Sequence, residues 1–123
     1  MPPGTSDVFL SIMQQIPVDG IVSVSTPQDL VGMIVGKAVN LASKMNIATI
    51  SAVENMSYFE CDECGKKHEI FGKSQVEEIS KKYNIATYDK IPINSEIAKL
   101  CDNGNIEDSD VNGILNNTIE KII

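Results

Sequence analysis

Arginine and tryptophan are absent from this 123-residue sequence, and histidine occurs once. All ten basic side chains are therefore lysines, against 17 acidic residues, and the formal net charge is −7. Proteins that bind duplex nucleic acid use clustered cations to displace counterions from the phosphates. The sequence has no such cluster, so we expect no nucleic-acid partner, and the chain cannot supply an arginine finger.

Long apolar runs are lacking as well. No stretch approaches the roughly 20 residues that a helix needs to cross a bilayer. The first residues lack the basic and apolar regions of a signal peptide, so we expect no membrane partner. The cysteines, Cys61, Cys64 and Cys101, are odd in number, which argues against the disulfide scaffold of a secreted protein. We expect a reducing, cytoplasmic compartment in which the thiols are free or bind a metal.

Hydrophobic residues make up an ordinary 42% of the chain and are arranged as alternating strands and helices. Residues 20–25 and 47–53 are short, apolar and β-branched, which is typical of buried strands. Between them we predict a helix over residues 27–45, with Thr26 as its N-cap and Pro27 at its first position. Strand, helix and strand in this order predict a parallel βαβ unit with a right-handed crossover.

Shorter elements are predicted on both sides of this unit. A helix is expected at residues 7–15, and another after a Ser74–Glu77 capping box, with Val76, Ile79 and Tyr83 on its apolar face. A short helix should run from a Ser95 cap to Cys101 and end at Gly104. A last helix is expected from an apolar stripe over residues 111–122. A weaker strand is expected between residues 85 and 91. The pattern predicts an α/β fold whose parallel sheet is covered on both faces.

A phosphate-binding P-loop of the form GxxxxGK[ST] is also missing. The nearest imitation is residues 32–38, where the glycines are one residue too close and Ala38 replaces the hydroxyl residue that binds Mg²⁺. This segment lies within the predicted helix 27–45. We therefore interpret its small residues as positions where the helix approaches the sheet.

The most distinctive motif is a CxxC formed by Cys61 and Cys64, followed by Gly65, in a polar segment over about residues 54–71. Two thiolates at this spacing can hold one metal ion, because a tight turn brings both sulfurs to the same side. Gly65 favours such a turn.

The residues alone leave four interpretations of this motif open. Zinc could take His68 and Cys101 as its third and fourth ligands. A [4Fe–4S] cluster needs four thiolates, which two chains could share. A redox pair needs a depressed thiol pKa, which the acidic Asp62 and Glu63 disfavour. Finally, the pair could be incidental, with His68 an exposed loop residue and Cys101 a buried structural thiol.

Three segments together are more specific than the CxxC spacing. They are PPGTSD at residues 2–7, TPQD at residues 26–29, and ENMSYF at residues 54–59 followed by the CxxC and its glycine. In this order they closely resemble the C-terminal half of Mrp/ApbC-type proteins, which are MinD-like P-loop ATPases that carry iron–sulfur clusters. The resemblance covers nearly the whole chain, and residues 71–72, 91–94 and 102–104 also fit it. It implies a parallel three-layer α/β sandwich of the P-loop NTPase type, with residues 1–123 as a single partial domain.

The resemblance also implies roles for individual residues. Gly4 would offer a backbone N–H near the terminal phosphate of the nucleotide. Asn55 would hydrogen-bond the adenine base, and Gln28 would lie where a strand end meets the nucleotide. The stretch from Pro92 to Asn94 would lie beside the base.

For the CxxC, the resemblance implies that Cys61 and Cys64 of two chains hold one [4Fe–4S] cluster. We therefore expect a homodimeric half-domain that delivers clusters to apo-proteins, with ATP and Mg²⁺ bound in the intact protein. The P-loop would precede Met1, so the chain alone is not expected to hydrolyse ATP, and its incomplete sheet should favour self-association. The alternatives are a zinc-stabilised binding module without catalysis and an ATPase fragment whose CxxC is only structural.

Overall fold

A computed structural model describes residues 7–109 and 113–123, and the side chains in these ranges except those of residues 29–31. The sheet consists of β1 (Ile21–Ser25), β2 (Thr49–Glu54) and β5 (Thr87–Lys90). These strands are parallel in the order β1-β2-β5, and α2 (Asp29–Lys44) connects the first two. The predicted parallel βαβ unit is therefore confirmed, within two residues at each boundary.

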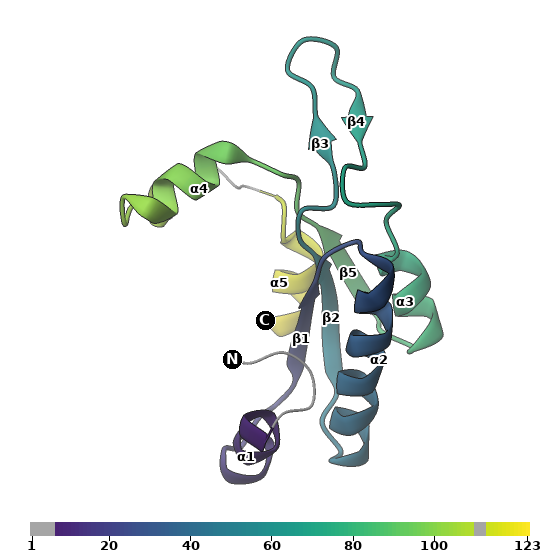
Figure 1. Cartoon of the computed structure of the whole chain (residues 1–123). Coiled ribbons are helices and arrows are strands. Elements are labelled where there is room, and N and C mark those ends of the chain that lie inside the picture. Colours follow the sequence, from purple (N-terminus) through teal and green to yellow (C-terminus); the bar gives the residue numbers. More distant parts are fainter. Residues whose placement is uncertain (1–6, 110–112) are drawn as a thin grey trace.

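Helices cover both faces of this sheet. Figure 1 shows α2 and α3 (Val76–Lys82) on one face, and α5 (Asn116–Ile122) on the other. The predicted three-layer α/β arrangement is confirmed. In the part of the chain that is described, no helix is both long enough and apolar enough to span a bilayer.

The remaining elements lie outside the three layers. They are α1 (Asp7–Gln15), the antiparallel hairpin of β3 (Phe59–Glu60) and β4 (Lys67–His68), α4 (Ser95–Asp102) and the 3-10 helix η1 (Ile106–Asp108). In Figure 1 the hairpin projects from the end of the sheet, and α4 extends to one side of it. The helix predicted over residues 7–15 is confirmed, but the hairpin was not predicted.

The main core lies between the sheet and the helices α2 and α3. It contains the buried apolar side chains of Val35, Val39, Ala52, Val76 and Ile85. Ile79 and Tyr83 pack against this core, so the apolar face predicted for α3 is confirmed. A second cluster forms where Phe9 and Met13 of α1 pack on Ala42 of α2.

The starts of three helices differ from the predicted caps. Gln28 rather than Thr26 occupies the N-cap of α2, and no side chain caps this helix. Gln75 rather than Ser74 is the N-cap of α3, because a carboxylate from β2 already accepts the first N–H groups of that helix. At α4 the cap is Asn94, whose Oδ1 accepts a hydrogen bond of 2.9 Å from the backbone N–H of Glu96.

The small residues of segment 32–38 lie inside α2, as predicted, but they face α3 rather than the sheet. A Cβ placed on Gly36 would overlap the hydroxyl of Tyr83 and lie 2.6 Å from its Cζ atom. A Cβ on Gly32 would lie 3.6 Å from Ile79 Cδ1, which is an ordinary contact. Only Gly36 is therefore required for the close approach of α2 to α3.

The last helix differs most from its prediction. Residues 111 and 112 lie outside the described ranges. Among the described residues of the predicted stripe only Thr118 is buried, so α5 packs on the sheet through polar groups. Thr118 donates from its N–H and its Oγ1 to Asp89 Oδ2 at 2.8 and 2.6 Å, while Ile119 and Ile122 remain 48% and 57% exposed. The reason is that two buried residues on the face of the sheet that meets α5, Asp89 and Ser51, are polar.

Candidate functional site

The CxxC forms the turn at the tip of the β3–β4 hairpin. The strand pairs Phe59–His68 and Glu60–Lys67 bring the two arms together. Beyond them, the Cys61 N–H donates to the carbonyl of Lys66 at 3.0 Å, and the Gly65 N–H donates to the carbonyl of Cys61 at 2.8 Å. Gly65 has φ +67°, a left-handed conformation that glycine adopts without strain. The predicted tight turn is confirmed, and it places both thiols on one turn at the tip of the hairpin.

The turn also changes the acidity of one thiol. Backbone N–H groups of Cys64 and Glu63, and then the Cys64 thiol, hydrogen-bond to Cys61 and lower the pKa of the Cys61 thiol. Partial burial and the negative charge of Asp62 oppose this shift with smaller effects. The charge of Asp62 thus disfavours a lowered thiol pKa, as expected, but the hydrogen bonds to Cys61 outweigh it. The turn favours the thiolate, which is the form that binds metals and acts as a nucleophile.

The zinc ligands proposed within one chain do not come together. His68 lies on β4 and is exposed, in line with the alternative of an exposed loop histidine. Cys101 is on α4, which Figure 1 shows well away from the hairpin. No group of three metal-binding side chains forms within residues 7–109 and 113–123. The prediction that Cys101 is a buried structural thiol is wrong, because this residue is exposed on a helix with no buried residues.

Three of the residues implied in nucleotide binding follow the carboxyl ends of the three parallel strands. Gln28 comes after β1, Asn55 after β2 and Pro92 after β5. The side-chain Oδ1 of Asn55 accepts a hydrogen bond of 2.9 Å from the Met56 N–H, which leaves its amide NH₂ group as the available donor. Gly4 lies outside the described residues.

Asn94, the remaining candidate, acts as the N-cap of α4. Its side-chain oxygen is therefore already used by the backbone.

The base of the hairpin continues the hydrogen bonding of the sheet. Ile91 N–H donates to the Glu54 carbonyl at 2.8 Å, Ser57 N–H to the Ile91 carbonyl at 2.9 Å, and Ile93 N–H to the Tyr58 carbonyl at 2.7 Å. The segment that enters the hairpin is thus bonded to the loop that follows β5. The candidate nucleotide-binding loop and the hairpin that bears the cysteines share these backbone contacts.

A carboxylate that sequence reasoning missed lies at this junction. Glu54 is only 1% exposed at the end of β2. Its Oε1 accepts from Ser57 Oγ at 2.6 Å, and its Oε2 accepts from the backbone N–H groups of Gln75 and Val76 at 2.9 and 3.0 Å. In the sequence, Glu54 can be noticed only as the acidic residue that directly follows the apolar run of residues 47–53.

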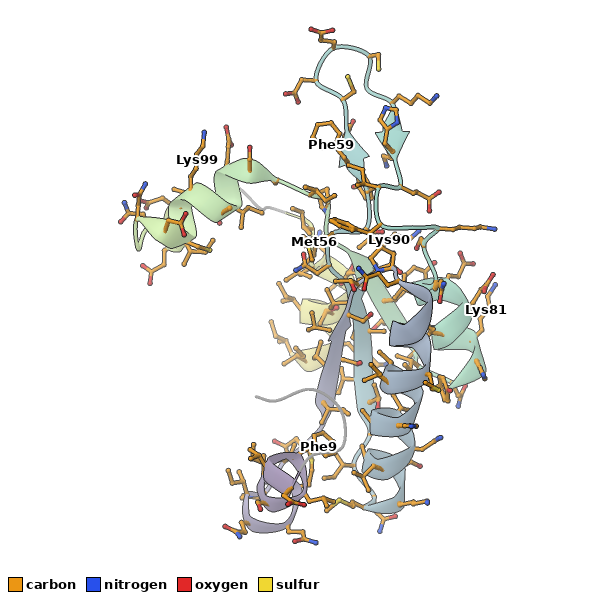
Figure 2. All side chains as sticks on the ribbon, in the orientation of Figure 1. Phe9, Met56, Phe59, Lys81, Lys90 and Lys99 are labelled. Atoms are coloured by element: carbon orange, nitrogen blue, oxygen red, sulfur yellow. The ribbon has the colours of Figure 1, made fainter. Side chains whose placement is uncertain are left out.

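A cleft of about 530 Å³ lies between the hairpin and α3. Its lining includes four of the ten lysines in the chain, which are Lys67, Lys73, Lys81 and Lys90. Lys81 pairs with Glu77 at 3.1 Å, and the Lys67 ammonium lies 4.7 Å from the centre of the Tyr58 ring. Figure 2 shows Lys90 close to the foot of the hairpin.

The chain is similar to known proteins along most of its length. A family model described as ParA, NUBPL iron-transfer P-loop NTPase, matches residues 1–123. The chain is 46% identical over 108 residues to an iron–sulfur cluster carrier protein of Clostridium perfringens, and covers 38% of that relative. It is 38% identical over 104 residues to the iron–sulfur cluster transfer protein NUBPL of Dictyostelium discoideum, and covers 32% of it. These alignments take in 88% and 85% of this chain.

A solved structure is similar as well. A nucleotide-binding protein from Archaeoglobus fulgidus, in complex with ADP, aligns with a TM-score of 0.79 and 42% identity. The alignment covers 88% of this chain and 44% of the solved one. The chain thus spans less than half of the length of each protein compared here.

Proposed function

Because the chain belongs to the ParA-type family of NUBPL iron-transfer P-loop NTPases, we propose that it carries an iron–sulfur cluster on Cys61 and Cys64. The observation that carries this proposal is the hairpin turn that presents both thiols together at an exposed tip. The lowered pKa of the Cys61 thiol supports it, since a cluster binds thiolates. The cluster is cargo here, received at the hairpin and passed to an apo-protein.

We further propose that two chains share one [4Fe–4S] cluster. Such a cluster takes four thiolates, and one hairpin supplies two. A homodimer that brings two hairpin tips together would complete the ligand set. The projection of the hairpin away from the sheet leaves room for a second tip to approach.

Nucleotide binding is proposed for the carboxyl edge of the sheet. Ligands of open α/β sheets bind at this edge, where Gln28, Asn55 and Pro92 lie. The free amide group of Asn55 suits an acceptor nitrogen of adenine, and Gly4 is proposed to contact the phosphates. For Asn94 we propose an indirect role, in which its cap orients the loop beside the base. ATP and Mg²⁺ would bind when residues 1–123, proposed as one partial domain, act within an intact cytoplasmic protein.

The test of the proposed function is an elemental analysis on protein purified without oxygen. Iron, acid-labile sulfide and zinc are measured per chain for the unmodified protein and for Cys61→Ala and Cys64→Ala. Cys101→Ala is the matched control, because it removes an exposed thiol outside the hairpin. We expect about two irons and two sulfides per chain, half of a shared [4Fe–4S] cluster, lost in the first two variants and kept in the control.

Two results would contradict the proposal. A full cluster in Cys61→Ala would show that the hairpin is not the carrier. About one zinc per chain without sulfide would instead favour a structural metal site. An absorption spectrum and a sedimentation measurement then separate one shared [4Fe–4S] cluster from a [2Fe–2S] centre in each chain.

A further inference from the structure

We propose that Glu54 is a positioning residue that fixes the base of the Cys61–Cys64 hairpin and so sets where the thiols are presented. The hydrogen bonds of Glu54 to both ends of the hairpin are seen in the structure. The consequence for cluster holding rests on the proposed function. Glu54 contacts neither cysteine and acts only through the two ends of the hairpin.

Glu54 is a buried carboxylate whose oxygens are both hydrogen-bonded. A carboxylate removed from water is costly unless hydrogen bonds replace its hydration. Glu54 is almost fully buried, and both of its oxygens accept hydrogen bonds, at 2.6, 2.9 and 3.0 Å. A carboxylate held in this way has few alternative positions, so the groups that donate to it are held as well.

The groups that donate to Glu54 lie on the two segments that enter and leave the hairpin. Ser57 lies on the segment that enters the hairpin, two residues before β3. Gln75 and Val76 lie where the returning chain begins α3, and their N–H groups are among those that a helix leaves without an intrahelical acceptor. One carboxylate at the end of β2 therefore ties the entry and the exit of the hairpin to the same point of the sheet.

The contacts at the base of the hairpin are separate from those that close the turn at its tip. The turn is closed by backbone bonds among Cys61, Gly65 and Lys66, and Glu54 takes no part in them. The strands β3 and β4 contribute two residue pairs between the arms, and all four of these residues are exposed. Loss of the Glu54 contacts should therefore leave the local chemistry of the thiols unchanged while the hairpin moves more freely on the sheet.

Amide hydrogen exchange on the metal-free chain tests this directly. In Glu54→Ala, exchange should rise at least about tenfold at Gln75 and Val76, whose N–H groups lose their acceptor. It should also rise at residues 57–60, because the Ser57 hydroxyl no longer holds this segment to the end of β2. Residues 35–39 of α2 should keep the exchange of the unmodified protein. Glu54→Gln should resemble the unmodified protein, since its amide oxygen can accept from both N–H groups and its NH₂ can donate to Ser57 Oγ.

The matched control is Glu60→Ala, which removes an exposed carboxylate from β3 itself. It should leave exchange at the hairpin base unchanged. If Glu54→Ala does not fold, Ser57→Ala decides the question, because it removes only the entry contact. Unchanged exchange at residues 57–60 in Ser57→Ala, or an equal rise throughout α2 and the sheet in Glu54→Ala, would overturn the inference.

A second readout links the inference to the cargo. The alkylation rate of Cys61 across pH should be the same in Glu54→Ala and in the unmodified protein. Loss of the bound cluster to a chelator should be about tenfold faster, because the two hairpins are held less firmly. If the unmodified chain carries no cluster, the proposed function fails, and the exchange pattern still decides the role of Glu54. If the cluster is carried but Glu54→Ala releases it at the normal rate, the positioning role fails alone.

Discussion

At the scale of single residues, backbone groups set the chemistry of Cys61. The N–H groups of Cys64 and Glu63 stabilise its thiolate more than the charge of Asp62 destabilises it. The sequence shows the charge of Asp62 but does not show where N–H groups point. For this reason the sign of the pKa shift could be read only from the folded turn.

The first prediction concerns the pH dependence of Cys61 alkylation in the metal-free chain. Because its pKa is lowered, the thiolate and the reaction rate should appear at a lower pH than for a free cysteine thiol. Cys64→Ala removes a thiol donor and should move the inflection to higher pH, whereas Asp62→Asn should move it lower. Mass spectrometry of the labelled peptide measures each rate. If the rate profiles of the unmodified chain, Cys64→Ala and Asp62→Asn have their inflections at the same pH, this account is contradicted.

The second prediction compares two glycines of α2. Gly36→Ala should lower the free energy of unfolding by about 1–3 kcal/mol, because the new methyl group would overlap Tyr83. Gly32→Ala has room for its methyl group and should raise stability by up to about 1 kcal/mol through helix propensity. Urea unfolding of both variants gives the two values. Equal effects would show that α2 and α3 do not meet as closely at Gly36 as described.

At the scale of elements, α5 is held to the sheet by a buried polar contact. Thr118 and Ser51 lie with their hydroxyl oxygens 2.7 Å apart, and Asp89 accepts twice from Thr118. The isoleucines of α5 are largely exposed, so they do not replace this contact. Hydrogen bonds therefore contribute substantially to the attachment of α5 to the sheet.

The third prediction follows from that contact. Thr118→Val keeps the shape of the side chain but removes the hydroxyl donor to Asp89, leaving a buried carboxylate with one partner fewer. The free energy of unfolding should fall by about 1–3 kcal/mol. Glu120→Ala, an exposed change on the same helix, is the control. Urea unfolding followed by circular dichroism measures both, and an equal loss in the two variants would refute the polar attachment.

Elements with strong local signals were predictable from the sequence. The strands around α2 are short apolar β-branched runs, and α2 is 16 residues long with a regular apolar face. The β3–β4 hairpin was missed because its two strands have two exposed residues each and show no apolar alternation. The start of α3 was shifted because its acceptor, Glu54, lies 21 residues earlier in the chain.

The candidate site was predictable only in part. Cys61 and Cys64 stand out by their spacing, and the glycine after them by its role in the turn. The resemblance implies that the stretch from Pro92 to Asn94 lies beside the base, but it does not show that the Asn94 side chain caps α4. Glu54 opens the ENMSYF segment, but nothing in the sequence assigns it a role, since its importance comes from donors that reach it through the fold.

At the scale of the whole molecule, one side of the sheet is incompletely covered. Within the described ranges β1 pairs with β2 alone, so the other edge of β1 is open. Val24 on this strand is 65% exposed, and the strand contains no lysine or proline to discourage edge pairing. Ile119 and Ile122 of α5 add further exposed apolar surface.

The fourth prediction is that the chain self-associates through β1. Sedimentation at about tens of micromolar should show species larger than the monomer, because an open apolar edge can pair with another chain. Val24→Lys should shift the distribution towards monomer. Met33→Lys changes a comparably exposed residue on α2 and should not. A clean monomer for the unmodified chain, or equal effects of the two lysines, would count against this prediction.

Because the hairpin projects from the body, substitutions in the hairpin can accumulate independently of substitutions in the sheet and the core. The arms of the hairpin leave the body and return to it at neighbouring points, and residues 62–73 are all exposed. Replacing this segment with a loop of another length or another set of ligands would not alter the register of any strand in the sheet. Exchange of this surface loop can therefore change the proposed cluster site while the proposed nucleotide edge and the core stay as they are.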